Sequence, residues 1–163
     1  MIKRIFTGNY DTCKAGNLIS ISGDRGKSAG FKGRAMPILA PKRKFWNVWH
    51  DNIGKIPEEE NDRYYLEQYH KETLSKIDFK ELLKDEKDPI FLCYEPAEMF
   101  CHRTGLAAYL NLKYGIEVHE IEIDENLNVK ENEMLAYVWN IMRDIVNREL
   151  EENNKNVRKE NEK

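Results

Sequence analysis

Long apolar runs are missing from this sequence of 163 residues. No segment approaches the roughly 20 consecutive apolar residues that a membrane-spanning helix needs, so we expect no membrane partner. The N-terminal stretch 1–8 is basic, but it lacks the apolar core of a secretory signal. These absences lead us to expect a soluble protein located in the cytoplasm.

Cysteine is scarce, and strong net charge is absent. The three cysteines are Cys13, Cys93 and Cys101, and an odd number without a secretory signal favours a reducing compartment. They form neither a C-x-x-C redox pair nor the phosphate loop of a thiol phosphatase. The 26 basic and 29 acidic residues give a net charge of −3, which excludes a general attraction to polyanions. Any anion binding must therefore be local.

The composition is that of an ordinary globular protein. Hydrophobic residues make up 40% and charged residues 34%, and the length suffices for a core without disulfides or metal. We expect one domain over residues 1–150. Residues 151–163 are almost all polar or charged, which predicts a frayed or disordered C-terminal tail.

Strand and helix patterns alternate along the chain. Strands are predicted at 2–6, 18–22, 89–94 and 116–123, the last with a bulge near residues 119–120. Helices are predicted at 45–52, 58–74 and 78–84. Another helix is predicted after the strand at 89–94, continuing to about residue 113 with Gly115 as its C-cap, and a last one starts at about residue 130. Between them, the Gly-rich and basic segment 23–44 predicts a long surface loop. The first two strands lie so close in sequence that either a short helical turn joins them or they are not neighbours.

This alternation predicts a single three-layer α/β domain: a small, mostly parallel sheet flanked by helices, flavodoxin-like or Rossmann-like, with a long C-terminal helix. Ligands of such sheets bind beyond the carboxyl ends of the strands. Those ends carry Gly8–Tyr10, Ser22–Arg25 and Cys93–Glu95. We expect the three segments to converge on one crevice.

The chemistry of the sequence is concentrated between Cys93 and Arg103, where a buried strand leads into a helix. A thiol at a helix N-terminus loses its proton easily, which makes Cys101 a candidate nucleophile. His102 is then a candidate acid/base, Arg103 a candidate clamp for phosphate or carboxylate, and Glu95 a candidate general base. The alternative is that Cys101 is a core residue, because neighbouring helix positions point about 100° apart.

The motif formed by Leu92-Cys93-Tyr94-Glu95 and Cys101-His102-Arg103 resembles the signature of the domain of unknown function 488 (DUF488) family. The similarity extends from the first strand, with its Tyr10, to about Ile123. Many members carry Asp-x-Arg after the second strand, whereas here Asp24 and Arg25 are adjacent. The resemblance implies a compact α/β sandwich with a site at the Cys-His-Arg corner, and it implies no particular activity.

We therefore expect an enzyme or binding domain for a phosphate-bearing or other anionic small molecule, such as a nucleotide. The expected ligand-binding residues, besides Arg103, are Arg25, Lys27, Tyr10 and Tyr94. Gly23–Ser28 has the ending of a phosphate-binding Walker loop, but only two residues separate its glycines, where four are required. No cofactor is expected.

Two other functions stay open. Lys42, Lys44 and Trp46 lie in a stretch that interleaves basic and aromatic residues, as nucleic-acid-binding surfaces do. Separately, Cys93, Cys101 and His102, joined by Cys13, offer the Cys₃His ligand set of a structural zinc site, although without the usual spacing.

Overall fold

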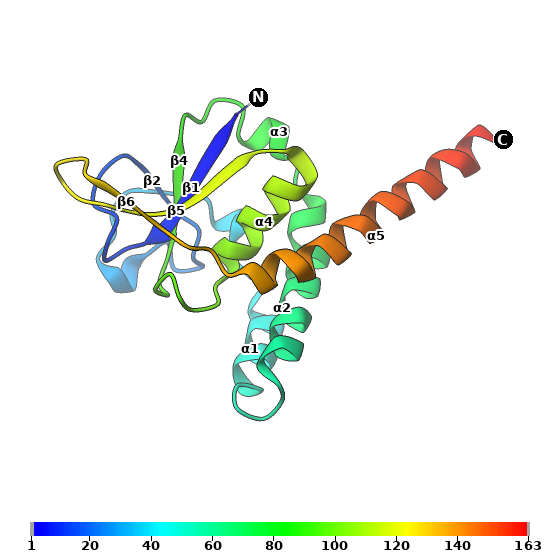
Figure 1. Cartoon of the computed structure of the whole chain (residues 1–163), viewed down its shortest axis with the longest axis horizontal. Coiled ribbons are helices and arrows are strands. Elements are labelled where there is room, and N and C mark those ends of the chain that lie inside the picture. The colour runs from blue at the N-terminus through cyan, green and yellow to red at the C-terminus, as the bar shows by residue number, and fades with distance from the viewer. Residues whose placement is uncertain (1, 163) are drawn as a thin grey trace.

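The computed structural model describes residues 2–162, so positions 1 and 163 of the predicted domain and tail lie outside it. Within this range six strands form one sheet (Figure 1): β1 (Arg4–Asn9), β2 (Asn17–Ser20), β3 (Arg34–Ala35), β4 (Pro89–Cys93), β5 (Glu117–Ile123) and β6 (Val129–Asn132). The same range holds the helices α1 (Arg43–Asp51), α2 (Glu58–Glu72), α3 (Phe79–Leu82), α4 (His102–Tyr114) and α5 (Ala136–Asn161).

The sheet has the order β3-β2-β4-β1-β5-β6. All neighbouring pairs are parallel except β5 with β6. The first two strands are therefore parallel but not adjacent, because β4 inserts between them. This insertion brings the carboxyl ends of β1, β2 and β4 to one edge of the sheet, as the sequence predicts.

The central strand β4 is buried along its whole length. Its side chains alternate between the two faces of the sheet, as a pleated strand requires. Phe91 packs into the larger apolar cluster with the helices, whereas Ile90 and Leu92 belong to a smaller cluster on the opposite face. Since Cys93 is two residues after Phe91, it faces the helices.

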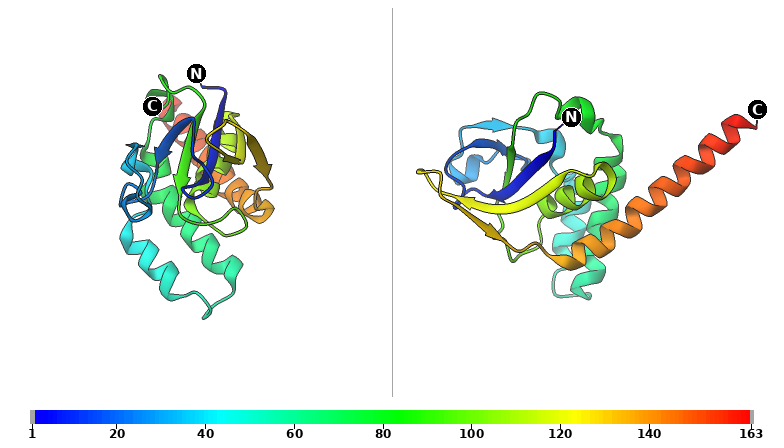
Figure 2. Two further views of the ribbon diagram at one scale, coloured as in Figure 1. Left: turned by 90° about the vertical axis from the view of Figure 1, so that its left-hand side faces the viewer. Right: turned by 45° about the horizontal axis from the view of Figure 1, so that its top comes forward.

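The molecule has the expected α/β arrangement, with a small, mostly parallel sheet packed against helices and a long C-terminal helix. Helix α4 packs on β1, β4 and β5, and α2 and α5 in turn pack on α4. Figure 2 shows these helices gathered on one side of the sheet. The other face is covered by Tyr10, Cys13 and Phe31 from the connections after β1 and β2.

The predicted bulge in β5 is wrong. Residues 117–120 pair with residues 4–7 of β1 in one constant register, which includes His119 and Glu120. Val118 and Glu120 face the helices, while Ile121 and Ile123 face the smaller cluster. The apolar pattern changes phase because a charged side chain, Glu120, takes a buried position on the helix face.

The last helix begins later than about residue 130. Residues 129–132 instead form β6, which returns along β5 after a turn in which the Asp124 carboxylate accepts backbone N–H bonds from Asn126 and Asn128. Helix α5 then starts at Ala136 and continues to Asn161, into the segment 151–163 that we expected to be frayed or disordered. Its C-terminal half extends beyond the rest of the fold (Figure 1) and is exposed.

No helix among residues 2–162 is both long and apolar enough to cross a membrane.

The C-terminal cap of α4 provides a test of the fold. Gly115 has φ +69, a left-handed conformation that is unfavourable for residues with a Cβ atom. We expect Gly115→Ala to lower the free energy of unfolding by about 1 kcal/mol in urea denaturation. Gly23→Ala is the matched control, because its Cβ would meet open space at a residue without positive φ. Equal effects of the two substitutions would contradict this cap.

Candidate functional site

The three strand ends predicted to converge do lie together. The Tyr10 and Tyr94 rings have centroids 4.8 Å apart. The Tyr10 hydroxyl lies 2.6 Å from Ser20 Oγ and also contacts Ser22 Oγ, while the Tyr94 hydroxyl donates to the Asp24 carboxylate. These contacts link the segments after β1, β2 and β4 into one polar corner.

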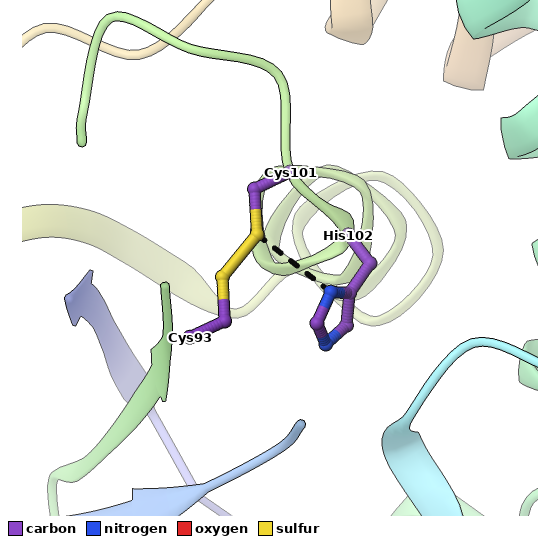
Figure 3. A group of neighbouring side chains, drawn as sticks. All are labelled: Cys93, Cys101 and His102. Carbon is purple, nitrogen blue, oxygen red and sulfur yellow. Dashed lines mark hydrogen bonds between the residues drawn. A yellow bond between two sulfur atoms is a disulfide. The ribbon is translucent and has the colours of Figure 1, made fainter. Parts of the chain in front are cut away.

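Cys93, Cys101 and His102 form a compact cluster at this corner (Figure 3). Cys93 ends β4, Cys101 is the N-cap of α4, and His102 is the first residue of that helix. One ligand atom from each side chain lies within 4.8 Å of the others, and all three residues are buried. The two sulfurs are joined as a disulfide between Cα atoms 7.7 Å apart.

The hydrogen bonds of His102 define its tautomer. Its Nε2 lies 2.8 Å from the carbonyl oxygen of Ile21, and because a carbonyl only accepts, Nε2 carries the proton. The neutral ring therefore presents the Nδ1 lone pair to Cys101 Sγ, 3.6 Å away (dashed in Figure 3). Burial lowers the pKa of His102 to about 4, which keeps the imidazole neutral near pH 7.

Arg103 has no exposed surface, and its guanidinium points inward. Nε donates to Glu120 Oε1 at 2.8 Å, Nη2 to Glu120 Oε2 at 3.3 Å, and Nη1 to Cys93 Sγ at 3.0 Å. Thr7 Oγ1 adds a hydrogen bond to the same carboxylate at 2.9 Å. A charge buried so deeply needs such partners. With its donors directed to these groups, Arg103 contacts the cysteine rather than an open ligand pocket.

Glu95 connects the buried cluster to open space. Its Oε2 lies 3.4 Å from Cys93 Sγ, and the half-buried side chain also lines a hollow of about 650 Å³. The lining of that hollow includes four acidic residues, Glu58, Asp62, Glu95 and Glu98, together with His50. This lining does not favour the anionic ligand that we expected from the sequence.

Three other predicted site residues, Arg25, Lys27 and Cys13, are not part of this cluster. Arg25 and Lys27 are exposed on the turn after β2. Cys13 packs on the opposite face of the sheet, with Sγ 3.3 Å from the Ile121 carbonyl oxygen, and burial raises the pKa of its thiol to about 11. Including Cys13 in the zinc ligand set was therefore wrong, because the sheet separates it from Cys93 and Cys101.

The basic and aromatic stretch around α1 borders the corner. Lys42 and Lys44 are exposed, whereas Trp46 is partly buried and stacks on His50 with centroids 4.7 Å apart. Trp46 lines the 650 Å³ hollow and also a second hollow of about 430 Å³ beside Tyr94.

Sequence reasoning missed three polar residues of this region: Asn61, Asp62 and Glu120. Their positions in an acidic helix start and in an alternating strand gave no sign that they are buried. The only signal for Glu120 was that the alternation of apolar residues in β5 shifts by one position. This shift could have been interpreted as a buried charge instead of a bulge.

Comparison with known proteins found no matching protein-family model, curated protein or solved structure. The resemblance to the domain of unknown function 488 family therefore stays a prediction that rests on the motif residues.

The buried ion pair can be tested by its effect on stability. Glu120→Gln removes the charge that compensates Arg103, and an uncompensated buried charge is strongly destabilising. We expect the free energy of unfolding to fall by about 3 kcal/mol in urea denaturation. Asp88→Asn, which breaks the exposed ion pair with Arg4, is the control and should have little effect. A loss for Glu120→Gln as small as in that control would contradict the burial of the pair.

His102 predicts a pH dependence of the metal-free protein, measured with a chelator present. An unfolded histidine has a pKa of about 6.5, whereas the folded value is about 4, so the unfolded state binds more protons between these limits. Stability should therefore fall by up to ~3 kcal/mol as the pH drops from 6.5 to 4. His102→Gln keeps a donor for Ile21 and should flatten this part of the profile; unchanged slopes would refute the assignment.

Proposed function

We propose that this chain is a metalloprotein that holds a zinc-class divalent ion between Cys93 Sγ, Cys101 Sγ and His102 Nδ1. The observation that carries the proposal is that three atoms of the types zinc prefers lie within 4.8 Å of one another. The expected Cys-His-Arg corner thus keeps its location but has a different chemical role.

The surroundings of the three atoms suit a metal centre. A ligating histidine usually donates its second ring N–H to a fixed acceptor, which is the relation between His102 and the Ile21 carbonyl. The N-terminus of α4 favours a thiolate at Cys101, and the guanidinium of Arg103 favours one at Cys93. Glu120 and Thr7 hold that guanidinium in position as an outer shell.

The oxidation state of the two cysteines controls this proposal. Metal binding requires both thiolates, so the disulfide must first be reduced. The Cα separation of 7.7 Å exceeds the 4.4–6.8 Å usual for disulfides, which favours two thiolates that share an ion as the working state.

The position of Glu95 suits the proposed centre to metal-assisted hydrolysis. A zinc ion with three protein ligands keeps a position for water and lowers the pKa of that water. The Glu95 carboxylate, 3.4 Å from Cys93 Sγ, can accept a proton there, and the adjoining hollow has room for a substrate. These groups support metal-assisted hydrolysis better than attack by Cys101, because that sulfur is buried and adjoins two other ligand atoms.

The proposal predicts the metal content of the reduced protein. After reduction, incubation with zinc and desalting, we expect about one zinc per chain by mass spectrometry of the metal. Cys93→Ser, Cys101→Ser and His102→Gln should each abolish or greatly weaken retention.

Cys13→Ser is the matched control, because Cys13 is also buried but lies across the sheet, and its hydroxyl can still bond Ile121. Full retention by this variant, with loss in the other three, supports the site. No retained zinc in well-folded reduced protein would overturn the proposal, as would equal losses in all four variants. Circular dichroism of each variant excludes loss through unfolding.

A further inference from the structure

The 650 Å³ hollow between α1, the start of α2 and the segment after β4 has a lining of a distinctive kind. Aromatic rings line part of it, with Trp49 and Phe100 centroids 5.7 Å apart and Trp46 next to Trp49 at 6.4 Å. Ile53 and Met99, both more than half exposed, add apolar surface. Hollows of this size and apolar character take small organic molecules.

Asn61, which lines the hollow, has an unsatisfied acceptor. The side chain is 3% exposed, and its Nδ2 donates to the Trp49 carbonyl oxygen at 2.9 Å. That bond fixes the orientation of the amide, and Oδ1 then has no hydrogen-bond partner among the described residues. A buried acceptor without a partner is costly, so it indicates a donor supplied from outside the chain.

The charges of the hollow indicate what kind of donor fits. Carboxylates are contributed by Glu58, Asp62, Glu95 and Glu98, and His50 also lines the hollow, whereas none of its lining residues within 2–162 is Lys or Arg. The Asp62 carboxylate accepts from Trp49 Nε1 at 2.9 Å and the Tyr137 hydroxyl at 2.7 Å, which fixes it beside Asn61. Acceptors, negative charge and aromatic faces together favour a cation that bears N–H groups.

We propose that this hollow binds a small organic cation, a guanidinium or primary ammonium group on a short apolar chain. The cationic head would donate to Asn61 Oδ1 among the carboxylates, and the chain would lie against Trp46 and Met99. This site does not rest on the proposed metal centre, since the two share no residue except the neighbouring Glu95.

The test compares four probes by calorimetry: butylguanidinium, butylurea, tetramethylammonium and an N-acetylated, C-amidated arginine. The protein is reduced and is measured both in chelator and after zinc loading. Butylguanidinium and butylurea have nearly the same shape and both donate N–H bonds, but only the first is charged. We expect butylguanidinium to bind about tenfold more tightly. Tetramethylammonium keeps the charge without N–H groups, and it should also bind more weakly because Asn61 Oδ1 stays unpaired.

Two variants localise the binding. Asn61→Ala should weaken butylguanidinium binding about tenfold, and Glu98→Gln, on the exposed rim, about threefold. Glu125→Gln, an exposed carboxylate away from the hollow, should leave it unchanged. If Asn61→Ala fails to fold, the effect of Glu98→Gln and the comparison of the probes still test whether the hollow binds the cation.

Equal affinity for the guanidinium and the urea, or no binding of either, would overturn the proposal whether or not zinc is retained. Tighter binding of an N-acetylated, C-amidated arginine than of butylguanidinium would support the site with a peptide side chain as the source of the cation. Because zinc content is measured separately, failure of the cation site and failure of the metal centre are distinguishable.

Discussion

The buried guanidinium of Arg103 is the group on which the organisation of this corner depends. It joins the first turn of α4 to Glu120 on β5 and to the sulfur of Cys93 at the end of β4, and Thr7 of β1 completes the network. A charge in this position is tolerated only because these partners compensate it. The same contacts hold the start of α4 over the carboxyl end of β4, where the thiols and imidazole meet.

The charged groups of this corner lie at two different depths in the molecule. The cation is enclosed with Glu120 beneath the cysteines, and His102 is kept neutral by burial, whereas carboxylates line the open hollow beside Glu95. The proposed metal centre would use the soft donors of the buried layer after reduction of the disulfide, and the proposed cation site would use the acceptors of the open layer. Glu95 lies at the boundary between the two layers and is the residue through which they could act together.

The sequence predicted the general architecture and the meeting of the strand ends, but not the contacts between the side chains there. Residues 89–93 form the fully apolar strand, and the motif at Cys101–Arg103 opens a helix next to it, because both features are local. The partners of Arg103 were not predictable, because Glu120 lies on another strand. The change in the apolar pattern at this residue was interpreted as a β-bulge instead of a buried charge. The face of the sheet on which Cys13 packs also depends on strand pairing that the sequence does not show. Without the pairing between β5 and β6, residues 129–132 could not be distinguished from the start of the last helix.

X-ray absorption at the zinc edge of the reduced, zinc-loaded protein tests the metal centre most directly. We expect two sulfur neighbours at about 2.3 Å and a nitrogen or oxygen shell at about 2.0 Å from the ion. Cys13→Ser should keep both sulfur neighbours, because Cys13 lies across the sheet from the proposed ligands. A spectrum with only nitrogen and oxygen neighbours in the wild-type protein would contradict zinc binding by Cys93, Cys101 and His102.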